Sequence, residues 1–208
     1  MTSVASPAAE RPEPLEAAIK GEVLRMYHEV AEHPENEFHF YHGRPAAEMF
    51  DYQRAWLDRA PPGAVASFAG VGNPHLRSRV REGDVVLDVG SGAGLDSIIA
   101  SWQVGRGGRV IGVDLNPEML TRASEHARQA GLEGVEFRQG RMEELPVDDQ
   151  AVSVVISNGV INLSFQKRRV FQDLFRVLRP GGRISVTDIV SAKQLKQSIV
   201  NDPKLWAS

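Results

Sequence analysis

Three glycines stand at alternate positions in LDVGSGAGLD, residues 87–96, and an acidic residue, Asp88, precedes the first of them. Glycines at a turn between a strand and a helix let the backbone bend sharply and let a ligand touch the main chain. Asp114 ends the next apolar run, about 20 residues further on, where a carboxylate can accept both hydroxyls of a ribose. The turn and this acid together predict a ligand that contains a nucleoside.

The spacing of these glycines favours one class of nucleoside ligand. A dinucleotide fingerprint reads G-x-G-x-x-G, and its third glycine would fall on the bulky Leu95. Here the third glycine comes one place earlier, and D-x-G-x-G-x-G favours S-adenosylmethionine, which brings no pyrophosphate to the helix. We expect Asp88 to attract the ammonium group of that cofactor. A dinucleotide oxidoreductase is the competing enzyme class, and glycines that only allow tight strand–helix packing are the alternative without a ligand.

A histidine-rich stretch before this turn offers candidate catalytic groups. FHFYHGR, residues 38–44, contains His39, Tyr41 and His42, any of which could act as a base if the acceptor arrives protonated. Imidazoles can also bind a metal, but no third ligand has suitable spacing, so we predict no metal site. The stretch is expected either to cover the cofactor as a lid or to form a surface turn.

Alternating apolar strands and amphipathic helices position these residues from residue 84 onward. The Pro180-Gly181-Gly182 turn should lead into the last strand, and the helix before it is expected to bury Val170, Phe171, Leu174, Phe175 and Leu178. This order predicts an α/β fold, a Rossmann-like doubly wound parallel sheet. The predicted strands cover 85–90, 109–115, 135–140, 152–158 and 183–189, and the helices cover about 94–103, 117–130 and 166–178.

The remaining sequence predicts three regions. Residues 1–14, rich in Ala, Pro and Ser, read as a disordered tail, and residues 15–80 as a helical lid segment that opens with a helix over 15–32. Residues 81–208 would form the cofactor-binding core. Only 19 residues follow Ile189, so we expect a sheet truncated after its fifth strand, whose open edge could support a homodimer.

Composition narrows the possible partners. The 24 basic and 27 acidic residues nearly balance, which argues against nucleic acid or an anionic membrane as a partner. No apolar run approaches the roughly 20 residues that span a bilayer. The chain has no cysteine, and its N-terminus lacks the pattern of a signal peptide, so a cytoplasmic location is expected.

Several phrases between about residue 68 and residue 190 resemble class I S-adenosylmethionine-dependent methyltransferases, and more narrowly their arsenite methyltransferase-like branch. The glycine motif is common to many methyltransferases, whereas FAGVGNP and SNGVINL are far more specific. The phrases are FAGVGNP (68–74), VVLDVGSGAGLDS (85–97), RVIGVDLNPEML (109–120), GRMEELPVDD (140–149), ISNGVINLS (156–164) and FRVLRPGGRISVTDI (175–189).

The resemblance implies a role for residues that follow the predicted strands. Asp114 would hold the ribose, and Asn158 would face the sulfonium or the substrate, which makes it a fourth catalytic candidate. The methionine end would lie against Gly90, Ser91, Gly92 and Gly94, and the adenine would lie near Leu115, Met142 and Glu143.

The resemblance also implies methyl transfer to a small-molecule acceptor; the alternative is a protein that binds S-adenosylmethionine without catalysis. One departure concerns the acceptor. Members of the arsenite branch often carry a cysteine after the Ser-Asn of the strand-four phrase, where this chain has Gly159. Trivalent arsenic prefers thiolate ligands. The sequence therefore does not support arsenite as the acceptor.

Overall fold

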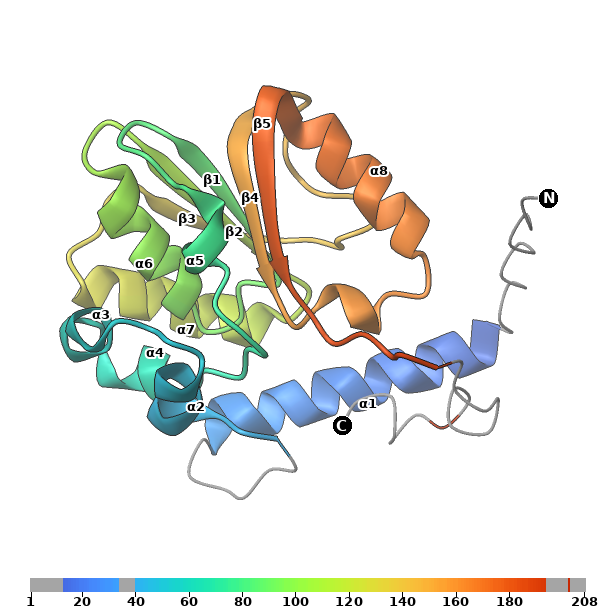
Figure 1. The fold of residues 1–208 in the computed structure, drawn as a ribbon. Helices are drawn as coiled ribbons and strands as arrows, with labels where there is room; N and C mark the ends of the chain where they lie inside the picture. Colours follow the sequence, from blue (N-terminus) through green and yellow to red (C-terminus); the bar gives the residue numbers. More distant parts are fainter. Residues whose placement is uncertain (1–12, 34–39, 194–201, 203–208) are drawn as a thin grey trace.

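A parallel sheet of five strands forms the centre of the computed structural model, which describes residues 13–33, 40–193 and 202 (Figure 1). The strand order is β3-β2-β1-β4-β5, and every neighbouring pair runs parallel. The predicted Rossmann-like sheet is confirmed. The strands are β1 (Val85–Val89), β2 (Arg109–Asp114), β3 (Val135–Gln139), β4 (Val152–Asn158) and β5 (Leu178–Thr187).

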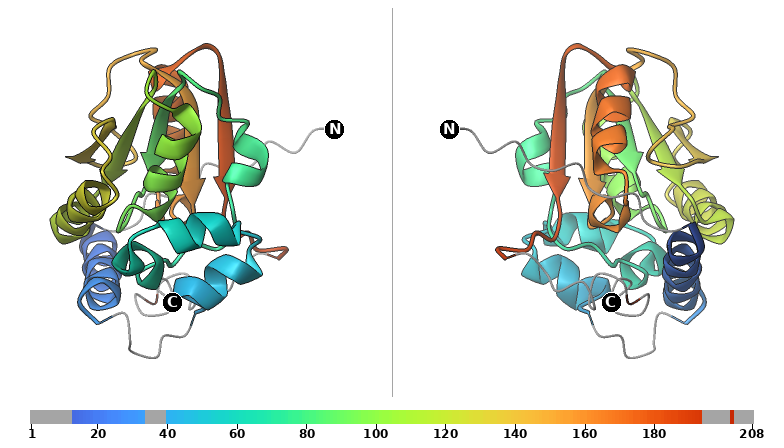
Figure 2. Two further views of the ribbon diagram at one scale, coloured as in Figure 1. Left: turned by 90° about the vertical axis from the view of Figure 1, so that its left-hand side faces the viewer. Right: turned by 90° about the vertical axis from the view of Figure 1, so that its right-hand side faces the viewer.

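Helices cover both faces of this sheet (Figure 2). Alternate residues of a strand point to opposite faces. In β1, Leu87 packs in one cluster with Leu174 of α8 (Lys167–Val177). Its neighbour Val86 packs on the other face against Ala100 of α6 (Leu95–Val104). Because both faces are covered, the three central strands β1, β2 and β4 are buried over most of their length.

The helix α7 (Pro117–Gln129) shows how the local sequence sets an element's bounds. The Asn116 side chain accepts a hydrogen bond from the Glu118 N–H, and Pro117 takes the first helical position, where no N–H is needed. Gly131, with φ +67°, follows the helix end. The predicted helix is confirmed at both ends.

The segment before the sheet is helical. Its long helix α1 (Glu13–Glu32) confirms the helix predicted over 15–32, and it runs across the carboxyl ends of the strands (Figure 1). Residues 1–12 of the predicted tail lie outside the described residues. The predicted boundaries between tail, lid segment and core, after residues 14 and 80, stay predictions. The shorter helices are α2 (Gly43–Met49), α3 (Arg54–Arg59), α4 (Pro62–Ala66), α5 (His75–Ser78) and the 3-10 helix η1 (Ile161–Leu163).

The last helix and strand differ from the prediction. Val170, Leu174 and Val177 are fully buried, whereas Phe171 and Phe175 are 49% and 80% exposed, so the expected burial of these two aromatics is wrong. Residues at i, i+4 and i+7 share one face of a helix. Each phenylalanine directly follows one of these buried residues in the sequence, so its side chain lies on a neighbouring side of the helix and points away from the sheet.

The fifth strand also begins earlier than expected. Leu178, assigned to the helix from sequence, is the first residue of β5, and the strand ends at Thr187. The Pro-Gly-Gly segment lies inside the strand, where the register with β4 shifts between Val152 and Val154. The turn residues therefore make an irregularity within the strand and not a separate turn before it.

Candidate functional site

The glycine turn after β1 combines close packing with one open position. A Cβ at Gly90 would lie 2.3 Å from the Val160 side chain, and one at Gly94 would lie 3.0 Å from the Ala123 Cβ. Tight packing therefore accounts for these two glycines. Gly92, with φ +49°, has nothing within 4 Å of such an atom. The open space over Gly92 is where a ligand can reach the main chain.

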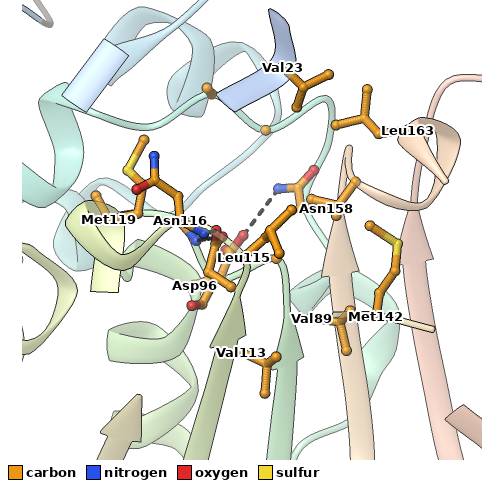
Figure 3. Close-up of a pocket in the computed structure, with 18 of the residues that line it drawn as sticks. Val23, Val89, Asp96, Val113, Leu115, Asn116, Met119, Met142, Asn158 and Leu163 are labelled. Carbon is orange, nitrogen blue, oxygen red and sulfur yellow. Dashed lines mark hydrogen bonds between the residues drawn. The ribbon is translucent and has the colours of Figure 1, made fainter. Parts of the chain in front are cut away.

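A cavity of about 180 Å³ opens over this turn, at the carboxyl ends of the strands (Figure 3). Ligands of open α/β sheets bind in this position. From α1, the cavity receives Ile19, Lys20 and Val23. All the predicted cofactor-binding residues except Asp88 line it, namely Gly90, Ser91, Gly92, Gly94, Asp114, Leu115, Met142, Glu143 and Asn158.

Asp114 ties the end of β2 to the glycine turn. The Gly92 N–H donates to its Oδ2 at 2.9 Å, and the Asn116 N–H donates to its Oδ1 at 2.9 Å. Burial raises the pKa of the Asp114 carboxyl, and these N–H donors oppose that rise. Each carboxylate oxygen has two lone pairs, so both can still accept from hydroxyl groups of a ligand. The ribose hydroxyls of an adenosyl group can donate to these oxygens.

Asp88 lies beneath the turn and not in the cavity. Its side chain is 2% exposed and accepts a hydrogen bond from the Ser97 Oγ at 2.6 Å. Burial, followed by the negative charge of Asp96, raises the pKa of Asp88 to about 8. At neutral pH this carboxyl keeps its proton, so the structure does not support the expectation that Asp88 attracts an ammonium group.

Asn158, the last residue of β4, is fixed in the cavity wall by both ends of its amide. Its Oδ1 accepts from the N–H groups of Val71 and Gly72 at 2.9 and 3.2 Å, and from the Thr187 Oγ1 at 2.8 Å. Its Nδ2 donates to Asp96 Oδ2 at 3.1 Å, the contact drawn in Figure 3. The FAGVGNP loop is thereby joined to two strands.

Three polar residues near this amide are not among the residues that the sequence predicts for the site. Asp96 lines the cavity, and Tyr52 and His75 contact its carboxylate from the segment before the sheet. Only the position of Asp96 in the first turn of α6 marked it in the sequence, because acids are favoured at helix N-termini.

Two further catalytic candidates, Tyr41 and His42, are not brought to the cavity. Tyr41 is 73% exposed, His42 precedes α2, and neither lines the cavity. His39 falls outside the described residues. Asn158 is thus the one predicted catalytic candidate that the described structure places there.

The described residues hold neither a metal-binding group nor a membrane-spanning helix. They contain no group of three or more His, Cys, Asp or Glu side chains that could hold a metal ion. None of the helices formed by these residues is long and apolar enough to cross a membrane.

Known proteins resemble this chain in both sequence and structure. A family model described as a methyltransferase domain matches residues 81–208. The arsenite methyltransferase of Halobacterium salinarum is 48% identical over 134 residues, which are 64% of this chain and 34% of that protein. The arsenite methyltransferase of Aquipseudomonas alcaligenes is 33% identical over 168 residues, which are 77% of this chain and 48% of that protein.

A solved structure extends this likeness to the fold. The crystal structure of CrArsM, an arsenic (III) S-adenosylmethionine methyltransferase from Chlamydomonas reinhardtii, matches with a TM-score of 0.67 and 39% identity. The match covers 73% of this chain and 53% of that one, so this chain spans between a third and about half of these relatives. The chain belongs to the S-adenosylmethionine-dependent methyltransferases, in their arsenite methyltransferase-like branch.

Proposed function

We propose that this protein binds S-adenosylmethionine in the cavity over Gly92 and transfers its methyl group to a small-molecule acceptor. The observation that carries the proposal is the meeting of an open glycine backbone with the Asp114 carboxylate, 2.9 Å apart, at the ends of adjacent strands. The family to which the chain belongs supports the same cofactor.

Each wall of the cavity has a part in this proposal. The turn from Gly90 to Gly94 would hold the methionine end, and Asp114 would accept the ribose hydroxyls. Leu115 and Met142 offer apolar surface for the adenine, with Glu143 beside them. These assignments follow the position of each residue on the strand ends.

The chain's contribution to the reaction is orientation and the exclusion of water. S-adenosylmethionine supplies an activated methyl carbon, and the protein must align an acceptor with it. The buried Ile19 and its neighbour Val23 close the cavity from α1 and keep water out. Asn158, held by its many hydrogen bonds, gives the wall one rigid amide.

We propose that this chain binds its methyl acceptor without cysteine thiolates. No cysteine is present among the 208 residues. Position 159, where a cysteine is common in the arsenite branch, has φ +75°, and a Cβ there would lie 3.1 Å from Val71. Both the backbone and the packing at this position favour glycine.

Calorimetric titration tests the cofactor proposal. We expect S-adenosylhomocysteine to bind and NAD not to bind. Replacing Asp114 by alanine should weaken S-adenosylhomocysteine binding about tenfold or more, on the order of 1.4 kcal/mol, because it removes the acceptor for the ribose hydroxyls. Asp58→Ala, at an exposed carboxylate beside Arg44, is the matched control and should bind like the wild type.

Two results would contradict this proposal. Binding of NAD in place of S-adenosylhomocysteine would assign the cavity to a dinucleotide, and an unchanged affinity in Asp114→Ala would remove the ribose assignment.

A second experiment tests methyl transfer itself. Transfer of a labelled methyl group should be measured over a panel of thiols, selenide, arsenite, amines and phenols. Binding without transfer to any acceptor would favour a role in cofactor binding alone.

We also propose that two copies of the chain pair through the free edge of β5. In the described structure this strand pairs with β4 alone, and Phe171, Phe175 and Ile184 are exposed nearby. A cytoplasmic location and the absence of a nucleic-acid partner stay predictions from the sequence.

A further inference from the structure

A buried polar cluster joins the segment before the sheet to the cavity wall. It consists of Tyr52, His75, Asp96 and Asn158, which we call the Asp96 cluster. The Tyr52 hydroxyl donates to Asp96 Oδ1 at 2.5 Å, and the His75 Nε2 lies 3.0 Å from the same oxygen. Asn158 Nδ2 donates to Asp96 Oδ2 at 3.1 Å. Three side chains from three different elements and loops thus hold one carboxylate in a fixed orientation.

Polar groups surround this carboxylate, which also lies in the first turn of a helix. Hydrogen bonds donated to a carboxylate stabilise the anion, and so does a place in the first turn of a helix. Tyr52 stays a donor, because burial and then the charge of Asp96 raise the pKa of its phenol well above 10. The neighbouring Asp88 instead takes up a proton, with a pKa raised to about 8. Of these two buried acids, Asp96 is the one that lines the cavity.

The Asp96 carboxylate can accept one further hydrogen bond from a ligand in the cavity. An ionised carboxylate has about four lone-pair directions, and the Asp96 cluster fills three of them. In the part of the chain that the structure describes, Asp96 contacts no lysine or arginine, and the imidazole of His75 is its one basic neighbour. The methionine end of the proposed cofactor carries an ammonium group, and the glycine turn that would hold it borders Asp96.

We propose that Asp96, oriented by Tyr52, His75 and Asn158, binds the ammonium group of the cofactor's methionine end. This inference rests on the proposed function. It gives Asp96 the role that the sequence suggested for Asp88, and it makes Tyr52 and His75 positioning residues of the cofactor site. The segment before the sheet would then help to recognise the cofactor as well as cover it.

The test compares S-adenosylhomocysteine with its desamino analogue, which lacks only the amino group, by calorimetric titration of the intact chain. In the wild type we expect the desamino analogue to bind about tenfold more weakly or worse. Asp96→Asn should lose about tenfold for S-adenosylhomocysteine and less than about twofold for the analogue, so that the difference between the two ligands disappears. Asp58→Asn, the same change at an exposed site, should keep the wild-type difference.

A second variant keeps the test decisive if Asp96→Asn does not fold. Tyr52→Phe retains the ring packing and the Asp96 side chain but removes the hydroxyl donor, so it should weaken S-adenosylhomocysteine binding more than analogue binding. Equal losses for both ligands in either variant would mean a structural role and would overturn the inference. A wild type that binds neither ligand would instead refute the proposed function, and equal binding of both ligands by the wild type would refute this inference alone.

Discussion

Asp88 and Asp114 both lie near the carboxyl ends of neighbouring strands, yet the structure gives them different surroundings. Asp114 receives two backbone N–H donors and borders the cavity. Asp88 receives Ser97 and is enclosed beneath the turn. The same type of side chain therefore borders the cavity in one place and is a neutral buried group in the other, because solvent and donors differ between the two places.

The pH dependence of stability should reveal the buried acid. The pKa of Asp88 rises from an ordinary 3.8 to about 8 in the folded protein. Between these values the folded state binds more protons than the unfolded state, so this residue makes stability fall as pH rises. Asp88→Asn removes that titration. Its stability relative to the wild type should increase from about pH 5 to about pH 8, by up to about 1.4 kcal/mol for each pH unit.

Thermal denaturation over that pH range measures this difference. Asp58→Asn, at an exposed carboxylate, should show no such trend against the wild type. A constant difference between Asp88→Asn and the wild type at all pH values would show that Asp88 is ionised in the folded protein.

How much of the site the sequence predicted depends on the distance over which its residues act. The glycine turn and Asp114 are local signals, since a strand, a turn and a following acid appear within one short stretch. The Asp96 cluster is different: Tyr52 is 44 residues from Asp96, and His75 is 21 residues away. Their meeting depends on how the helices before the sheet pack on α6, which no periodicity reveals.

At the scale of elements, the cavity is covered by the first helix of the segment 15–80, which the sequence predicts as a helical lid. For FHFYHGR the sequence left a lid and a surface turn open, and the described part of that stretch does not line the cavity. The helix α1 supplies Ile19, Lys20 and Val23 in its stead. Its helical spacing was evident in the sequence, whereas its position across the strand ends follows from tertiary packing.

The helix α8 offers a direct comparison of two adjacent apolar residues. Leu174 is fully buried against the sheet and Phe175 is largely exposed. Leu174→Ala should lower the free energy of unfolding by about 2 to 5 kcal/mol, because it leaves a cavity in the core. Phe175→Ala should change the free energy of unfolding by less than about 0.5 kcal/mol, because the side chain lies at the surface.

Urea denaturation of the two variants measures both values. The comparison is matched, since both changes truncate a large apolar side chain on the same helix. Similar losses in the two variants would mean that Phe175 is covered in solution, either within the chain or by a second copy.

At the scale of the whole molecule, the open edge of the sheet is the feature with the widest consequence. β5 is ten residues long and pairs with β4 on one side only, as far as the described residues show. A free edge of this length is a template for another strand. Two identical edges related by a two-fold axis meet as antiparallel neighbours, which would join two five-stranded sheets into one.

Ile184, 43% exposed in this edge strand, gives the means to test that pairing. Charged lysine side chains on edge strands oppose pairing, so Ile184→Lys should shift a wild-type dimer to monomer, with an association constant about tenfold or more lower. Met49→Lys places the same charge at an exposed apolar residue of α2 and should remain dimeric. Sedimentation equilibrium over a range of concentrations decides between them. A monomeric wild type would refute the pairing. Equal effects of the two lysines would place the self-association of this chain at another surface. Neither result bears on the cofactor cavity at the strand ends.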